Sequence, residues 1–164
     1  MTIYFYKVDE PYGCFSNFSP HGIQLQSKYW STVEHYYQAQ KFMGTVDAAL
    51  IPIIHAAPTP AEAALLGRDC TRQVRPDWEQ VKIQVMRTAV LKKFLTHADI
   101  AKILISTDNQ LIVENSPTDY YWGWGENKTG QNHLGQILMT VRQEIGQRCT
   151  DDKARPKPLP ANEV

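Results

Sequence analysis

The sequence has no excess of charge of either sign, because 17 lysine and arginine residues balance 17 aspartate and glutamate residues. A protein that attracts nucleic acid through its overall electrostatic field carries a surplus of basic residues. This chain carries none, so it must recognise any partner through local contacts. The charge balance therefore argues against a general nucleic-acid-binding protein.

Cysteine is scarce, and no two cysteines lie close together in the sequence. Cys14, Cys70 and Cys149 lie far apart and include no C-x-x-C motif. Disulfide frameworks use even numbers of cysteines, and zinc ribbons use closely spaced cysteine pairs. We therefore expect neither, and we expect the protein in a reducing cytoplasm.

Long apolar runs are also missing. The most apolar stretch, residues 48–57, is interrupted by Pro52 and His55, and residues 1–7 do not have the pattern of a signal peptide. We expect no membrane segment. The composition, 43% hydrophobic and 21% charged, is typical of a soluble globular domain.

The domain organisation follows from one change in composition near the end. Residues 151–164 are rich in proline and charge and poor in apolar side chains. We expect one domain over residues 1–150 and a disordered tail over residues 151–164.

The periodicity predicts few strands and several helices. Strand-like segments cover residues 3–6, 23–26, 29–30 and 111–114, and the second and third of these form a tight antiparallel hairpin. Helical patterns begin at Ser31, Val46, Thr59, Pro76, Ala98 and Gly135. The predicted fold class is α+β, a predominantly helical single domain with a small antiparallel sheet.

Familiar catalytic motifs do not fit. The segment from Gly123 to Gly130 has the wrong residue at the third glycine of G-x-G-x-x-G, and Gln131 and Asn132 follow it where a P-loop has Lys and Ser or Thr. The chain also has no G-x-S-x-G elbow, and its histidines never fall four apart on a helix. These spacings exclude standard nucleotide loops, serine hydrolases and zinc proteases.

One helix face gathers polar groups of different kinds. At 100° per residue, Glu34, Gln38 and Lys41 lie on the same side of the helix that begins after Ser31. A structural interpretation is that Glu34 completes a capping box with Ser31 while the other two face solvent. The aromatic flanks, Tyr36 and Tyr37, instead favour a shielded pocket.

Two loops have the composition of ligand-binding segments. Residues 116–135 contain four glycines, two tryptophans and two tyrosines, and residues 13–18 form a shorter loop of the same kind. Glycines allow a ligand to approach the backbone, and aromatic faces stack on heterocycles. The alternative is an ordered loop whose tryptophans fill the core. Arg68 is a candidate for binding phosphate.

These motifs together resemble the YbiA-like, or NADAR, family of N-glycosidases. The resemblance covers roughly residues 3–146, and its most specific part is E-H-Y-Y-Q-A-Q-K-F at residues 34–42. Further matches are F-S-N-F at 15–18, G-R at 67–68, Trp78, Met86, Y-W-G at 121–123, Gly125 and N-H-L-G at 132–135. Trp124 departs from the pattern, since E. coli-type members have an acidic residue there.

The resemblance implies hydrolysis of an N-ribosidic bond. Some members cleave ribose 5-phosphate from the aminopyrimidine of early riboflavin intermediates, and others remove ADP-ribose from guanine bases. Both substrates join an exocyclic nitrogen to C1 of a phosphate-bearing ribose. We place the small phosphorylated ribosyl-heterocycle first, because the chain has no basic patch. ADP-ribosyl-guanine, with nucleic acid as the partner, is the alternative, and a non-catalytic nucleotide-binding module is the second.

The family chemistry assigns roles to residues. Glu34 is the catalytic candidate that supplies a proton, stabilises a cation at C1 or activates water. Lys41 either forms a Schiff base with the sugar or remains charged as a clamp. No cofactor and no metal are expected. The expected substrate-binding residues are Asn17, Gln38, Arg68, Trp78, Trp122, Gly123, Gly125 and Asn132.

Overall fold

The computed structural model describes residues 1–154, with side chains for residues 1–148. In chain order the elements are β1 (Thr2–Phe5), the 3-10 helix η1 (Gly13–Phe15), β2 (Ile23–Leu25), β3 (Lys28–Trp30), α1 (Val33–Gln40), α2 (Leu50–His55), α3 (Pro60–Gly67), α4 (Trp78–Thr96), α5 (Ala98–Ile105), β4 (Leu111–Glu114) and α6 (His133–Ala154).

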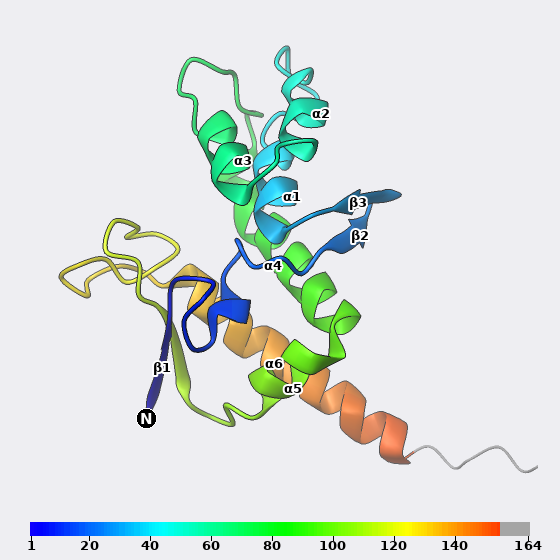
Figure 1. The fold of residues 1–164 in the computed structure, drawn as a ribbon, viewed down its shortest axis with the longest axis vertical. Coiled ribbons are helices and arrows are strands. Elements are labelled where there is room, and N and C mark those ends of the chain that lie inside the picture. The colour runs from blue at the N-terminus through cyan, green and yellow to red at the C-terminus, as the bar shows by residue number, and fades with distance from the viewer. Residues whose placement is uncertain (155–164) are drawn as a thin grey trace, which may run out of the picture.

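Helix α4 runs through the middle of the molecule, as Figure 1 shows. Helices α1, α2 and α3 pack together on one side of the view, and α5 and α6 lie toward the other. Both α1 and α6 contact α4 directly. The two groups of helices therefore share one core, as the predicted α+β single domain requires.

The strands form two separate pairs. Strands β2 and β3 make the predicted antiparallel hairpin, with Ile23 opposite Trp30. Its turn residues, Gln26 and Ser27, have φ angles of 53° and 60°, as a tight two-residue hairpin turn requires. Strand β1 pairs with β4 in parallel, which the sequence analysis did not predict. This pairing places the N-terminal segment beside the loop that follows β4.

The start of α1 differs from the predicted capping box. Thr32, and not Ser31, is the N-cap, and its hydroxyl accepts a hydrogen bond from the backbone N–H of His35. The side chain of Glu34 instead accepts a hydrogen bond from Gln38. Because Glu34 does not close a capping box, its carboxylate remains available to the interior.

Among the boundaries of α2, α3 and α6, one agrees with its prediction and two differ from theirs. Thr59 caps α3 and Pro60 occupies its first turn, as predicted. Helix α2 begins at Leu50, four residues later than the pattern beginning at Val46 suggested. Helix α6 reaches Ala154 and so enters the segment predicted as a tail, of which residues 155–164 lie outside the described residues.

The core is apolar and aromatic where α4 meets its neighbours. A stripe of residues along α4 is buried, at Trp78, Met86, Ala89 and Phe94. The ring of Phe94 contacts Phe15 edge-on at 5.9 Å between centroids. This contact fixes η1, and with it the following loop at residues 16–18, against α4. Within residues 1–154, no helix has the length and apolar character needed to cross a membrane.

Candidate active site

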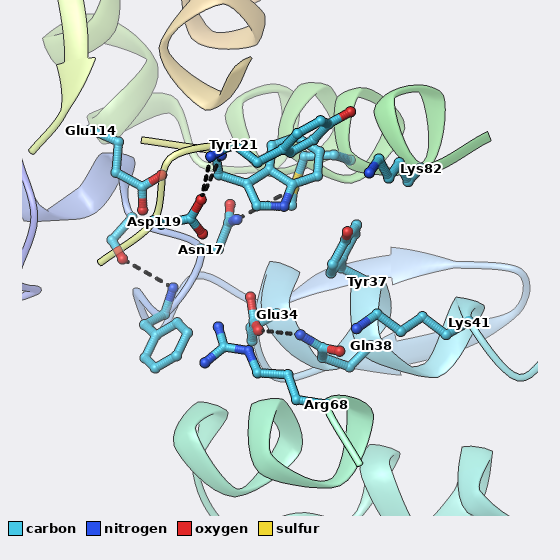
Figure 2. Close-up of a pocket in the computed structure, with 14 residues that line it drawn as sticks. Asn17, Glu34, Tyr37, Gln38, Lys41, Arg68, Lys82, Glu114, Asp119 and Tyr121 are labelled. Carbon is cyan, nitrogen blue, oxygen red and sulfur yellow. Dashed lines mark hydrogen bonds between the residues drawn. The ribbon is translucent and has the colours of Figure 1, made fainter. Parts of the chain in front are cut away.

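A cavity of about 280 Å³ lies between α1, α4, the end of α3, the loop at residues 16–18 and the loop that follows β4. Figure 2 shows charged and amide side chains from all five segments pointing into it. No two of these segments are adjacent in the sequence. Tertiary packing of the helices and the β1–β4 pair therefore creates the site.

Glu34 lies on the wall of the cavity that α1 forms. Its side chain is 4% exposed, and Nε2 of Gln38 donates a hydrogen bond of 2.7 Å to its Oε1. Burial raises the pKa of Glu34, while the Gln38 hydrogen bond and the charges of Arg68 and Lys41 oppose that rise. The carboxylate is thus desolvated but has a donor and two cations nearby.

Lys41 follows Glu34 by seven residues and is the C-cap of α1. Its Nζ donates a hydrogen bond of 2.9 Å to the carbonyl of Gly67 and lies 5.7 Å from the centroid of the Tyr37 ring. Burial lowers the pKa of Lys41 to about 8, and the nearby Glu34 charge opposes this change. With this pKa, about a tenth of the amine is unprotonated at pH 7 and about half at pH 8.

Gln38 is held against the end of α3. A Cβ added at Gly67 would lie 2.1 Å from Oε1 of Gln38, so the absence of a side chain at Gly67 makes room for this amide. Gln38 is 2% exposed. The close approach of α1 and α3 thereby fixes the amide that orients Glu34.

Two further cations reach the cavity. Arg68, at the C-cap of α3, extends toward Glu34 in Figure 2. Lys82, on α4, lies with Nζ 3.8 Å from the centroid of the Tyr121 ring and pairs with Glu79. With Lys41, these residues place positive charge on both helical walls, which suits an anionic ligand.

Two acidic residues lie on the opposite wall, at β4 and the loop that follows it. Oδ1 of Asp119 accepts hydrogen bonds from the backbone N–H groups of Tyr121 and Trp122 at 2.9 and 2.7 Å. Burial, together with the charges of Asp119 and Glu34, raises the pKa of Glu114 to about 8. The cavity is therefore bounded by three carboxyl groups.

Several buried acceptors around the cavity have no hydrogen-bond partner among the described residues. These atoms are Oδ1 of Asn17, Oε1 of Gln38 and Oε2 of Glu114. A buried polar atom without a partner costs about 1–3 kcal/mol. A ligand with several hydroxyl or amino groups would supply partners for the oxygens of Asn17 and Glu114.

The cavity continues into a larger outer groove of about 960 Å³. The two share Arg68, Glu114, Asp119 and Tyr121 among their lining residues. The outer groove extends from there to Tyr6 on the N-terminal segment and to Tyr120. A ligand larger than a sugar can thus occupy both compartments.

Six of the ten residues expected at the site from the sequence line the inner cavity. They are Asn17, Glu34, Gln38, Lys41, Arg68 and Trp122. Trp78 does not line it, because its ring packs behind Tyr37 at 5.1 Å between centroids and is 7% exposed. Trp78 supports the wall that Tyr37 presents to the cavity.

The other three expected residues shape the loop after β4 and do not line the cavity. Asn132 donates to the carbonyl of Ile112 at 2.9 Å and accepts from the N–H of Glu114 at 3.0 Å. A Cβ at Gly123 would lie 2.8 Å from the Glu114 carbonyl, and Gly125 has a φ of 71°. These residues hold the loop against β4.

The structure adds residues that the sequence analysis did not single out as binding residues. Tyr37, Lys82, Glu114, Asp119 and Tyr121 all line the cavity. Asp119 and Tyr121 belong to the loop already noted for its aromatic and glycine content. Lys82 and Glu114 carry no local signal, because an isolated charge on a helix or at a strand end is common.

Trp124, the residue that departs from the family pattern, packs on β1. Its ring stacks on Tyr4 with 5.9 Å between centroids and an interplanar angle of 14°. It lines neither compartment. In the part of the chain that the structure describes, no three His, Cys, Asp or Glu side chains are grouped closely enough to hold a metal ion.

Comparison with known proteins gives consistent matches. The model of the NADAR domain family matches residues 4–146. An N-glycosidase of Nostoc punctiforme is 70% identical over 145 residues, which cover 88% of this chain and 93% of that protein. The N-glycosidase YbiA of Escherichia coli is 41% identical over 143 residues, which cover 87% and 88% of the two chains.

A plant relative and a solved structure extend the comparison. The chloroplastic riboflavin biosynthesis protein PYRR of Zea mays is 45% identical over 157 residues, covering 87% of this chain but 25% of that longer protein. The NMR structure of E. coli YbiA superposes with a TM-score of 0.83 at 36% identity, covering 99% of this chain and 91% of YbiA.

Proposed function

The chain belongs to the NADAR domain family, and from this membership and the site we propose that it is an N-glycosidase that hydrolyses the C1–N bond of a phosphorylated ribosylamine. Relatives named as N-glycosidases and as a riboflavin biosynthesis protein support this activity. In the structure, the observation that carries the proposal is the presence of Glu34 and Lys41 on one wall of a cavity whose buried acceptors lack partners.

The reaction needs stabilisation of positive charge at C1. When the C1–N bond breaks, its electron pair leaves with nitrogen and C1 becomes cationic. The Glu34 carboxylate, oriented by Gln38, stabilises that cation and accepts a proton from the attacking water. Burial strengthens this interaction, because few waters remain to screen it.

Lys41 offers a covalent route to the same products. In the ring-opened imine of the substrate, the neutral Lys41 amine adds to C1. Both N–H protons of the Lys41 amine pass in turn to the substrate nitrogen, one on addition and one as its bond to C1 breaks. This nitrogen leaves as a free amine, and C1 is left joined to Lys41 as a Schiff base. Water then hydrolyses this bond and releases the sugar. The lowered pKa of Lys41, about 8, supports this role.

The remaining groups fit the parts of such a substrate. Asn17 and Gln38 face the sugar hydroxyls, and Trp122 and Tyr37 cover the sugar face. Arg68 and Lys82 provide the cations for phosphate. We place a small phosphorylated ribosyl-heterocycle, of the kind found in early riboflavin intermediates, as the substrate.

A second candidate substrate is ADP-ribosylated guanine. The outer groove of about 960 Å³, with Tyr6 and Tyr120 on its walls, has room for a group much larger than a single sugar phosphate. Its tyrosines would stack on a second heterocycle.

A side-by-side assay tests the proposal and separates these substrates. The purified protein is incubated with the aminopyrimidine ribosylamine phosphate and, separately, with DNA carrying ADP-ribosyl-guanine. We expect the protein to release ribose 5-phosphate from the aminopyrimidine substrate with a larger kcat/KM than it shows on the DNA. A larger kcat/KM on the DNA would make ADP-ribosyl-guanine the preferred substrate. Binding of both substrates without turnover of either would instead indicate a non-catalytic nucleotide-binding module.

A further inference from the structure

Glu114 lies at the junction of the two compartments. It is the last residue of β4, where it pairs with Phe5 of β1, and its backbone N–H donates to Oδ1 of Asn132 at 3.0 Å. Glu114 lines both the inner cavity and the outer groove. A sugar beside Glu34 and Lys41 with its heterocycle in the outer groove would place the scissile bond at this junction.

The surroundings of Glu114 favour a neutral carboxyl group. The charges that act on it are Asp119 and Glu34, which disfavour ionisation, and Arg68, which favours it. Lys41, Lys82, Tyr37 and Tyr121 line the same cavity, and no described residue hydrogen bonds to its Oε2. Burial is the largest influence, and with the two carboxylates it raises the pKa of Glu114 to about 8.

Glu34 has different surroundings in the same cavity. Burial raises its pKa too, but the hydrogen bond from Gln38 and the charges of both Arg68 and Lys41 favour its ionised form. Two carboxyl groups whose environments differ in this way divide naturally into an acid and a base. Asp119 is less suited to donate a proton, because its Oδ1 already accepts two backbone hydrogen bonds.

We infer that Glu114 donates the proton to the leaving nitrogen and that Glu34 acts as the carboxylate of the pair. This assignment rests on the proposed function. The proton moves from Glu114 to nitrogen as the C1–N bond breaks and its electron pair goes to nitrogen. Water then adds to C1 and gives one proton to Glu34. Transfer of that proton back to Glu114 through solvent restores both groups.

The first test is Glu114→Gln, which keeps the size of the side chain and removes its acidic proton. We expect kcat to fall at least about 100-fold, as loss of a general acid commonly gives, with KM changed less than about threefold. Glu126→Gln, at an exposed glutamate of the loop that follows β4, is the matched control and keeps wild-type kcat. A Glu114→Gln variant within about threefold of wild-type kcat overturns the assignment.

The pH profile separates proton donation from a structural role. Wild-type kcat falls above pH about 8, as Glu114 loses its proton, and Glu114→Gln lacks this alkaline decline. An unchanged alkaline decline in the variant would contradict the inference. Turnover by the wild-type protein tests the proposed function alone. The ratio of kcat in Glu114→Gln to kcat in the wild type tests the role of Glu114 as proton donor.

A direct measurement follows the protonation of Glu114 in the wild-type protein and needs no turnover by the variant. The carboxyl carbon of Glu114 in ¹³C-glutamate-labelled wild-type protein is expected to titrate near pH 8, and its resonance is identified by its absence from Glu114→Gln spectra. A carboxyl group already ionised at pH 7 would show that Glu114 cannot be the proton donor.

Discussion

Nε2 of Gln38 donates a hydrogen bond of 2.7 Å to Oε1 of Glu34, one turn earlier on α1. Side chains four residues apart lie on the same face of a helix, so this pair forms within α1 itself. Gln38 in turn occupies the space left by the missing side chain of Gly67. The orientation of the carboxylate thus depends on how closely α1 and α3 approach.

Replacing Glu34 with glutamine is expected to abolish most hydrolysis. In Glu34→Gln an amide oxygen can still accept the Gln38 hydrogen bond, but no carboxylate remains to stabilise C1. We expect kcat/KM to fall at least about 100-fold, with the circular dichroism spectrum unchanged. Glu62→Gln, at an exposed position of α3, is the control. Wild-type rates in Glu34→Gln would remove Glu34 from the mechanism.

Borohydride trapping decides the role of Lys41. If the sugar forms a Schiff base with Lys41, reduction during turnover leaves a stable ribose adduct that mass spectrometry locates on this residue. The yield should increase from pH 6 to pH 8, because the neutral fraction of an amine with a pKa of about 8 increases over that range. Lys41→Arg should lose both the adduct and the activity. An active Lys41→Arg protein would exclude the covalent route and leave an electrostatic role.

Gly67→Ala tests the contact between α3 and the Glu34–Gln38 pair. The new methyl group would lie 2.1 Å from Oε1 of Gln38 and must displace it. We expect lower kcat and a loss of about 1–3 kcal/mol in the free energy of unfolding. Gly146→Ala is a matched control in another helix, since a Cβ there meets no atom within 4 Å. Equal behaviour of the two variants would contradict the proposed steric role.

Lys93 predicts a pH dependence of stability. Its side chain is 1% exposed, its Nζ donates to the carbonyl of Ser16 at 2.9 Å, and burial lowers its pKa to about 7. Above pH 7 the unfolded chain holds this proton while the folded protein releases it, so stability rises with pH. The slope approaches about 1.4 kcal/mol per pH unit.

The measurement is urea unfolding from pH 7 to pH 9. Subtracting the values for Lys93→Met from those for wild type removes the contributions of the other titrating groups. We expect the difference in unfolding free energy to increase in favour of wild type as pH rises. Lys102→Met, at an exposed position of α5, should show no such trend. A flat difference for Lys93→Met would refute the prediction.

Local sequence signals predicted the local parts of the site. The shared face of Glu34, Gln38 and Lys41 follows from helical geometry, and the structure places all three on the cavity. The helix start predicted at Thr59 likewise agrees with α3, whose N-cap is Thr59. These features depend on residues within a few positions of one another, which is the range over which periodicity and capping operate.

The contributions of distant segments could not be predicted in this way. Glu114 reaches the cavity because β4 pairs with β1 in parallel, and nothing in residues 111–114 specifies that partner. Trp78 is the opposite case, because it was expected to bind substrate but does not line the cavity. Its indole ring suggested stacking on substrate, but its position on the buried stripe of α4 turns it toward Tyr37. In both cases tertiary packing decides which side chain faces the ligand.

The parallel pairing of β1 with β4 also sets an order of events during protein synthesis. Thr2 can pair only after Leu111, its partner in the register, has been synthesised, so the β1–β4 pair cannot form earlier. At about 5–20 residues per second, the ribosome needs about 5–20 s to make the intervening chain. During that interval Ile3 and Phe5, which are buried in the finished protein, lack their strand partner. Strand β1 is therefore the first strand to be synthesised and among the last to pair. Its apolar side chains are available for a chaperone to bind on the nascent chain.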